Sequence, residues 1–114
     1  MARNFIQPGN TITLTAPSGG VVSGTVYLIG ALLVVAQSTA AQTLPFEAKT
    51  TGVFELPKAT GQTWSEGAKV YWDNTAKNFT TTSSGNTLAG VAVKPGGEIS
   101  GATLGWVRLD GVTR

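Results

Sequence analysis

Residues 26–36 read VYLIGALLVVA, the most apolar stretch of this 114-residue chain. A membrane-spanning helix needs about 20 apolar residues, roughly twice the length of this run. The run also lies too deep in the chain, without a basic flank, to be a signal peptide. Gly30 interrupts it. The stretch therefore predicts two short buried strands, 25–29 and 31–36, of which the second is too continuously apolar to have a solvent-facing side.

Around this stretch, the first third of the chain is free of charge. No Lys, Arg, Asp or Glu lies between Arg3 and Glu47, and charged residues make up 12% of the whole sequence. A soluble domain usually has about a quarter of its residues charged. With a membrane span excluded, we expect this segment to be either core or a surface that works against another protein.

The rest of the chain favours short strands joined by turns. It contains 15 Gly and 5 Pro, and no window shows sustained apolar spacing of a helix. KVYWD (69–73) alternates, so that Val70 and Trp72 point one way and their charged neighbours the other. The expected strands are 11–15, 25–29, 31–36, 44–49, 52–57, 69–73, 79–82, 88–93 and 103–109.

This pattern predicts an all-β protein, a small single-domain β-barrel or β-sandwich with an extended N-terminal arm. We assign residues 1–10 to the arm and residues 11–114 to a single β domain. Phe5 and Ile6 are apolar residues ahead of the Pro8-Gly9 turn signal. Residues 59–67 are expected to form a connection with room for one helical turn.

Catalytic chemistry finds little support in the composition. Cys and His are absent, which removes thiol nucleophiles, imidazole bases and Cys/His zinc sites. The stretch GQTWSEGAK (61–69) differs from a phosphate-binding loop in glycine spacing, and it leads into a strand rather than a helix. We therefore expect no enzyme, no cofactor and no metal. Basic residues are scattered singly, which argues against nucleic acid as a partner.

The tryptophans are open to two interpretations. Trp72 is expected in the core, whereas Trp106 shares a strand face with Arg108. Trp and Arg are enriched in protein interfaces, so Trp64, Trp106 and Arg108 are candidates for a subunit interface. The rival interpretation makes Trp64 or Trp106 an aromatic platform for a sugar, and the protein a carbohydrate- or receptor-binding module.

Three stretches carry a resemblance to a known family: GVFELPKATGQTWSEGAKVYWD (52–73), GNTLAGVAVKP (85–95) and GWVRLDG (105–111). Together they resemble the small capsid cement, or head decoration, proteins of tailed phages. Members of the family have also been labelled a RecA/RadA-type recombinase. The present sequence contradicts that label, because it lacks the phosphate loop and is far shorter than an ATPase core.

The resemblance implies a structural protein that binds the outside of an assembled phage capsid and stabilises it. It implies a homo-oligomer, commonly a trimer and in some members a dimer, made in the host cytoplasm. It also implies an N-terminal arm that orders against the major capsid protein. In this chain the arm residues would be Arg3, Asn4, Phe5, Ile6, Gln7 and Pro8, with Phe5 and Ile6 as anchors.

Overall fold

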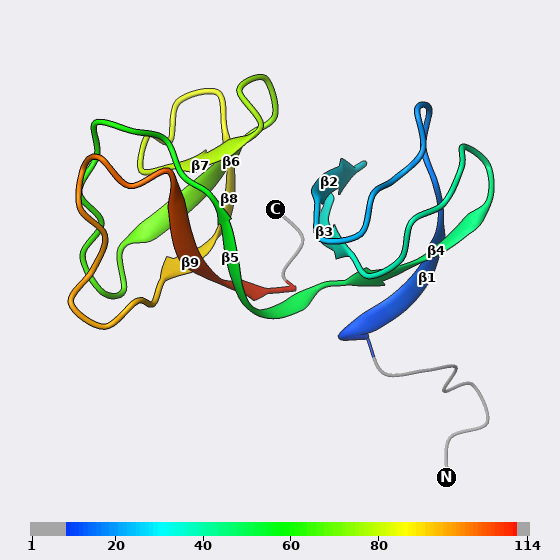
Figure 1. Cartoon of the computed structure of the whole chain (residues 1–114), viewed down its shortest axis with the longest axis horizontal. Helices are drawn as coiled ribbons and strands as arrows, with labels where there is room; N and C mark the ends of the chain where they lie inside the picture. Colours follow the sequence, from blue (N-terminus) through cyan, green and yellow to red (C-terminus); the bar gives the residue numbers. More distant parts are fainter. Residues whose placement is uncertain (1–8, 112–114) are drawn as a thin grey trace, which may run out of the picture.

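The computed structural model describes residues 9–111 and forms nine β-strands, with no helix in that range (Figure 1). The first sheet has the order β1-β4-β3-β2 and consists of β1 (Thr11–Thr15), β2 (Val26–Ile29), β3 (Leu32–Ala36) and β4 (Pro45–Lys49). The second has the order β5-β9-β8-β6-β7 and consists of β5 (Thr51–Pro57), β6 (Lys69–Asp73), β7 (Asn78–Thr80), β8 (Thr87–Ala92) and β9 (Leu104–Asp110). Every strand pairing is antiparallel. The all-β prediction is therefore confirmed.

The apolar run of residues 26–36 forms the hairpin β2–β3, turning at Gly30 with a φ of 62°. Its two faces pack against different clusters. Val34 and Ala36 join a first cluster inside the N-terminal sheet, whereas Val26 and Val35 join a second cluster that belongs mainly to the other sheet. Both faces are thus covered by apolar side chains, which explains why this hairpin has no polar alternation.

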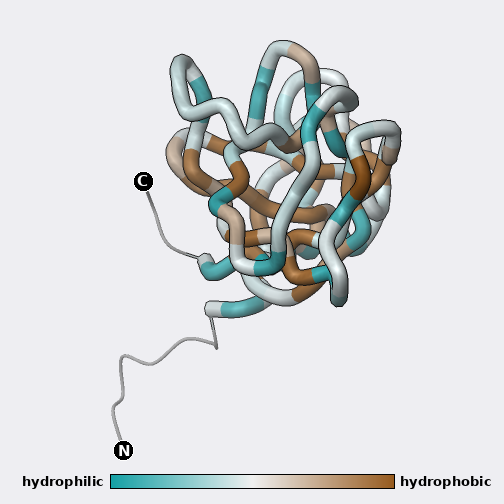
Figure 2. The backbone as a smooth tube through the Cα atoms, turned by 90° about the vertical axis from the view of Figure 1, so that its left-hand side faces the viewer, coloured by the Kyte–Doolittle hydropathy of each residue, from teal (hydrophilic) through white to brown (hydrophobic). Residues whose placement is uncertain are grey.

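The first cluster lies between the N-terminal sheet and the loops that fold over it. Phe46 and Ala48 of β4 contribute from the sheet, and Ala16 and Val21 contribute from the connection between β1 and β2. Apolar segments gather in the middle of the body and more polar loops project from it (Figure 2). One face of the N-terminal sheet is therefore covered by its own loops.

The second sheet curls until its two edge strands meet. Lys58, directly after β5, forms a parallel bridge with Phe79 of β7, and the Ala59 N–H donates to the Phe79 carbonyl at 2.9 Å. The interior is filled by inward side chains such as Val107 and by Trp72, whose ring centroid lies 4.9 Å from that of Phe79. The C-terminal half is thus a small barrel, as seen where β5, β9, β8, β6 and β7 wrap around one another in Figure 1.

The predicted strands all exist, with boundaries that differ by up to two residues. The one helical turn allowed for residues 59–67 does not form; Trp64 there makes an isolated antiparallel bridge with Glu98. The predicted arm lies mostly outside the described residues. Its last two residues, Gly9 and Asn10, tie to Thr50, whose hydroxyl donates to the Gly9 carbonyl at 2.6 Å.

Candidate interaction surfaces

An exposed face with mixed chemistry covers two neighbouring strands of the barrel. We call it the β5–β9 face; its residues are Val53, Glu55, Leu104, Trp106 and Arg108. Register places Val53 opposite Arg108 and Glu55 opposite Trp106. Val53 is 56% exposed and Trp106 38% exposed, although both are large and apolar.

The β5–β9 face is slightly hollowed. A shallow depression of about 350 Å³ is lined by Val53, Phe54, Glu55 and Trp106. Its apolar floor is flanked by the exposed side chains of Glu55 and Arg108, which carry opposite charges. Apolar centres with Trp and Arg are typical of protein interfaces. Trp106 and Arg108 share one face of β9, as strand alternation predicted, and what they bind stays a prediction.

Trp64 does not lie on the β5–β9 face, and its side chain is buried. Its relative exposure is 0%, and it is the largest fully buried side chain among the described residues. Gly105 of β9 lets the indole approach, because a Cβ at that position would lie 2.4 Å from Trp64 Cζ3. Trp64 therefore belongs to the core, which corrects its assignment to a subunit interface or a sugar platform. The sequence placed Trp64 in a connection and gave no periodicity from which burial could be read.

Two buried charged residues lie close to Trp64 and were not singled out from the sequence. The Lys58 ammonium donates to the carbonyls of Ala59 and Gln62 and lies 5.5 Å from the centroid of the Trp64 ring. One carboxylate oxygen of Glu98 accepts a hydrogen bond from the backbone N–H of Trp106 at 3.0 Å. The other carboxylate oxygen lies 3.7 Å from Lys94 Nζ. These bonds hold loops to one end of the barrel.

Burial lowers the pKa of Lys58 below its ordinary value of 10.5, and the nearby negative charge of Glu98 partly offsets this effect. A signal for the burial of Lys58 exists in the sequence. Phe54, Leu56 and Lys58 follow one another at every second position, so strand alternation directs all three to the inside. Because its hydrogen bonds go to backbone carbonyls, the geometry assigns Lys58 a structural role.

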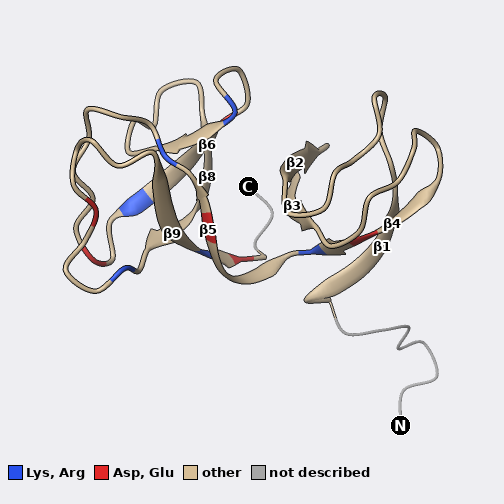
Figure 3. Ribbon diagram, in the orientation of Figure 1, with Lys and Arg blue, Asp and Glu red and all other residues tan. Residues whose placement is uncertain are grey.

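The N-terminal lobe presents a surface without charge. We call this the neutral surface: the exposed positions of residues 16–25 and 37–45, the two loops that flank the β2–β3 hairpin. Figure 3 shows these loops without Lys, Arg, Asp or Glu, whereas charged residues occur on β4 and across the C-terminal half. The loops carry hydroxyl and amide side chains that bond within the lobe, such as Thr39, which accepts from the Ser23 N–H at 3.0 Å. The uncharged segment thus supplies both core and surface.

A deeper hollow separates this lobe from the barrel. It has a volume of about 510 Å³ and runs along β2, with Pro17, Ser18 and Gly20 on the lobe side. Trp72, Asn74 and Lys77 line the barrel side. Nothing in the sequence indicated this hollow, because it arises only where the two halves meet.

Other kinds of site were sought in the same residues. Among residues 9–111, no group of three or more Asp or Glu residues is arranged to hold a metal ion. No helix in that range is long and apolar enough to cross a membrane. The arm residues Arg3 to Pro8, assigned to capsid binding, lie outside the described residues.

The fold and its surfaces define an all-β module with extended, weakly charged faces. Comparison with known families gives the assignment: the family model described as phage cement protein matches residues 6–109, nearly the whole chain. The chain belongs to the phage cement protein family, as its resemblance predicted. Membership implies a structural, non-enzymatic role in association with a phage capsid. No curated protein and no solved structure matches the chain.

Proposed function

We propose that this protein binds the outer surface of an assembled tailed-phage capsid and stabilises it by contacting the major capsid protein. The observation that carries the proposal is the neutral surface. It is exposed in the single chain yet holds no Lys, Arg, Asp or Glu. Removing neutral polar groups from water costs far less than removing charges, so this surface is suited to be covered by another protein.

The amino-terminal residues 3–8 supply a second contact in this proposal. Phe5 and Ile6 insert into the shell, and the backbone around them adds main-chain hydrogen bonds to a neighbouring sheet. Gly9 and Asn10 are held by Thr50, so the arm starts from a fixed point on the lobe. The protein is made in the host cytoplasm and ends in the virion.

The β5–β9 face joins subunits to one another, with a trimer proposed and a dimer as the alternative. Val53, Leu104 and Trp106 provide apolar area, and Glu55 and Arg108 provide opposite charges at its margin. Linking subunits makes the second and third contacts with the shell intramolecular, which multiplies the effect of modest patches.

The test is co-sedimentation of the purified protein with expanded empty shells of the phage. The full chain is expected to sediment with the shells. A variant lacking residues 2–8 is expected to fold normally and to lose about thirtyfold or more in affinity, corresponding to roughly 2 kcal/mol or more from the buried Phe and Ile side chains. Far-ultraviolet circular dichroism and thermal melting establish that the variant is folded.

Salt dependence adds a second criterion. Because the neutral surface carries no charge, raising the salt concentration is expected to weaken binding only slightly. A full chain that stays in the supernatant under all conditions contradicts capsid binding. A truncated chain that binds as tightly as the full chain contradicts only the proposed role of the arm.

A further inference from the structure

The outer edge of β2 is open to an additional strand. β2 is the last strand of its sheet and pairs only with β3. The Ala36 N–H donates to the Thr25 carbonyl at 3.0 Å. In an antiparallel pair, successive residues direct their backbone N–H and C=O groups alternately toward the partner strand and away from it. The N–H and C=O groups of Val26 and Leu28 consequently point away from β3. Within residues 9–111 no other strand pairs with this edge.

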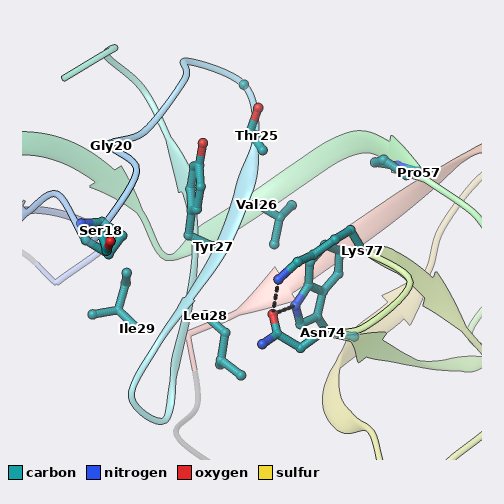
Figure 4. Close-up of a pocket in the computed structure, with 13 residues that line it drawn as sticks. Ser18, Gly20, Thr25, Val26, Tyr27, Leu28, Ile29, Pro57, Asn74 and Lys77 are labelled. Carbon is teal, nitrogen blue, oxygen red and sulfur yellow. Dashed lines mark hydrogen bonds between the residues drawn. The ribbon is translucent and has the colours of Figure 1, made fainter. Parts of the chain in front are cut away.

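The edge lies in the 510 Å³ hollow between the two halves, which we call the β2 groove. Side chains of β2 alternate between its walls (Figure 4). Tyr27 and Ile29 lie on the side of Ser18, and Val26 and Leu28 on the side of Asn74 and Lys77. A strand added here would place its own side chains alternately against the lobe and against the barrel.

The groove carries one ionisable cation. Lys77 is the only charged residue among those that line the groove, and its ammonium donates to Asn74 Oδ1 at 3.0 Å. The same Asn74 oxygen accepts from Trp72 Nε1 at 3.0 Å, so the amide is fixed in place. The remaining lining is mostly apolar or hydroxyl-bearing. The groove is therefore complementary to an apolar segment that carries a carboxylate.

We propose that the β2 groove receives an extended, apolar segment of the capsid protein that carries a carboxylate, bound as an additional strand on β2. Its main chain bonds to Val26 and Leu28, and its carboxylate pairs with Lys77. The inference rests on the proposed function, which makes the shell the source of the segment. The arm of a second copy is the poorer occupant, because Arg3 would bring a positive charge to the groove of Lys77.

Three variants test the groove in the shell co-sedimentation experiment. Leu28→Pro removes an outward N–H from an edge strand, a position that tolerates proline. Lys77→Glu reverses the charge of the groove, and Lys69→Glu makes the same change at an exposed position of β6. We expect about tenfold weaker binding for Leu28→Pro and Lys77→Glu, as for the loss of one or two net hydrogen bonds or an ion pair. Lys69→Glu is expected to bind like the wild type.

Amide hydrogen exchange of the wild-type chain provides a readout that needs no variant. On binding to shells, the amides of Val26 and Leu28 are expected to exchange at least about ten times more slowly than in the free protein. If Leu28→Pro does not fold, Lys77→Glu and this exchange measurement decide. Suppose that the wild type binds shells, that exchange at both amides is unchanged, and that Lys77→Glu binds with full affinity. This result overturns the binding of a capsid segment in the β2 groove and leaves capsid binding intact. Failure of the wild type to bind shells overturns both proposals.

Discussion

At the scale of single residues, the contact between Gly105 and Trp64 shows how the barrel is closed. Trp64 comes from a loop and is fully buried, and its ring rests on the backbone of β9 where Gly105 has no side chain. The indole N–H donates to Gln62 Oε1 at 3.4 Å. The sequence showed a strand over 103–109, but it did not show which glycine makes room for which ring.

Replacement of Gly105 by alanine is therefore expected to destabilise the protein. The added Cβ would lie 2.4 Å from Trp64 Cζ3 in a fully packed core. Such overpacking costs about 1–3 kcal/mol of unfolding free energy. The measurement is urea unfolding followed by tryptophan fluorescence. Gly101→Ala is the matched control, since nothing lies within 4 Å of a Cβ at that position; equal stability of the two variants would contradict the assigned contact.

Lys58 gives the stability a dependence on pH. Its pKa in the folded protein is lowered, chiefly by burial. As pH rises through that value, the folded chain releases the proton while the unfolded chain still holds it until about 10.5, so the unfolding free energy rises with pH. Below the folded-state pKa both states are protonated, and this dependence vanishes.

The variant Lys58→Met isolates this contribution. It loses the hydrogen bonds to the carbonyls of Ala59 and Gln62, so we expect it to be less stable by about 1–3 kcal/mol. The unfolding free energy of the wild type minus that of Lys58→Met is expected to grow on the alkaline side, up to pH 10.5. A constant difference would show that the ammonium is not desolvated in the folded protein.

At the scale of elements, the β2–β3 pair and the β5–β9 pair differ in whether one face or both faces are covered by apolar side chains. The β2–β3 hairpin is apolar on both faces and lies between two clusters. β5 and β9 alternate, with Leu56 and Val107 inside and Val53 and Trp106 outside. Alternation is a local property of the chain, so the sequence predicted that Trp106 and Arg108 share one face of β9.

The β5–β9 face leads to a prediction about assembly. Trp106→Ala removes an aromatic side chain from this face without touching the core, and truncation of a hot-spot Trp in an interface costs about 2 kcal/mol or more. We expect the proposed oligomer of this variant to dissociate at concentrations where that of the wild type remains assembled, as measured by sedimentation velocity. Val22→Ala, at a 59% exposed position of the other half, is expected to leave assembly unchanged.

Two outcomes would change the interpretation of this face. An oligomer of Trp106→Ala as stable as that of the wild type would remove the face from the subunit interface. If the same variant also lost binding on a glycan array, Trp106 with Glu55 opposite would instead be a sugar platform, and the protein a carbohydrate-binding module.

At the scale of the whole molecule, two halves with different charge content share one hairpin. The barrel carries most of the charged residues, and the N-terminal lobe presents the neutral surface. Val26 and Val35 of the hairpin belong to the cluster of the barrel, so packing links the halves. The description of residues 11–114 as a single domain stays a prediction that this shared packing supports.

The sequence alone determined the all-β class, the nine strands and the inward or outward direction of most strand residues, because these follow from alternation and turn residues within a few positions. It also determined the family and the absence of charge from the first third of the chain. Only the tertiary structure decided that Trp64 lies inside, that the Lys58 ammonium binds the carbonyls of Ala59 and Gln62, and that a groove opens along β2. The burial of Trp64 and the groove depend on contacts between residues far apart in the chain, such as Gly105 with Trp64 and β2 with Lys77, and local periodicity carries no information about them.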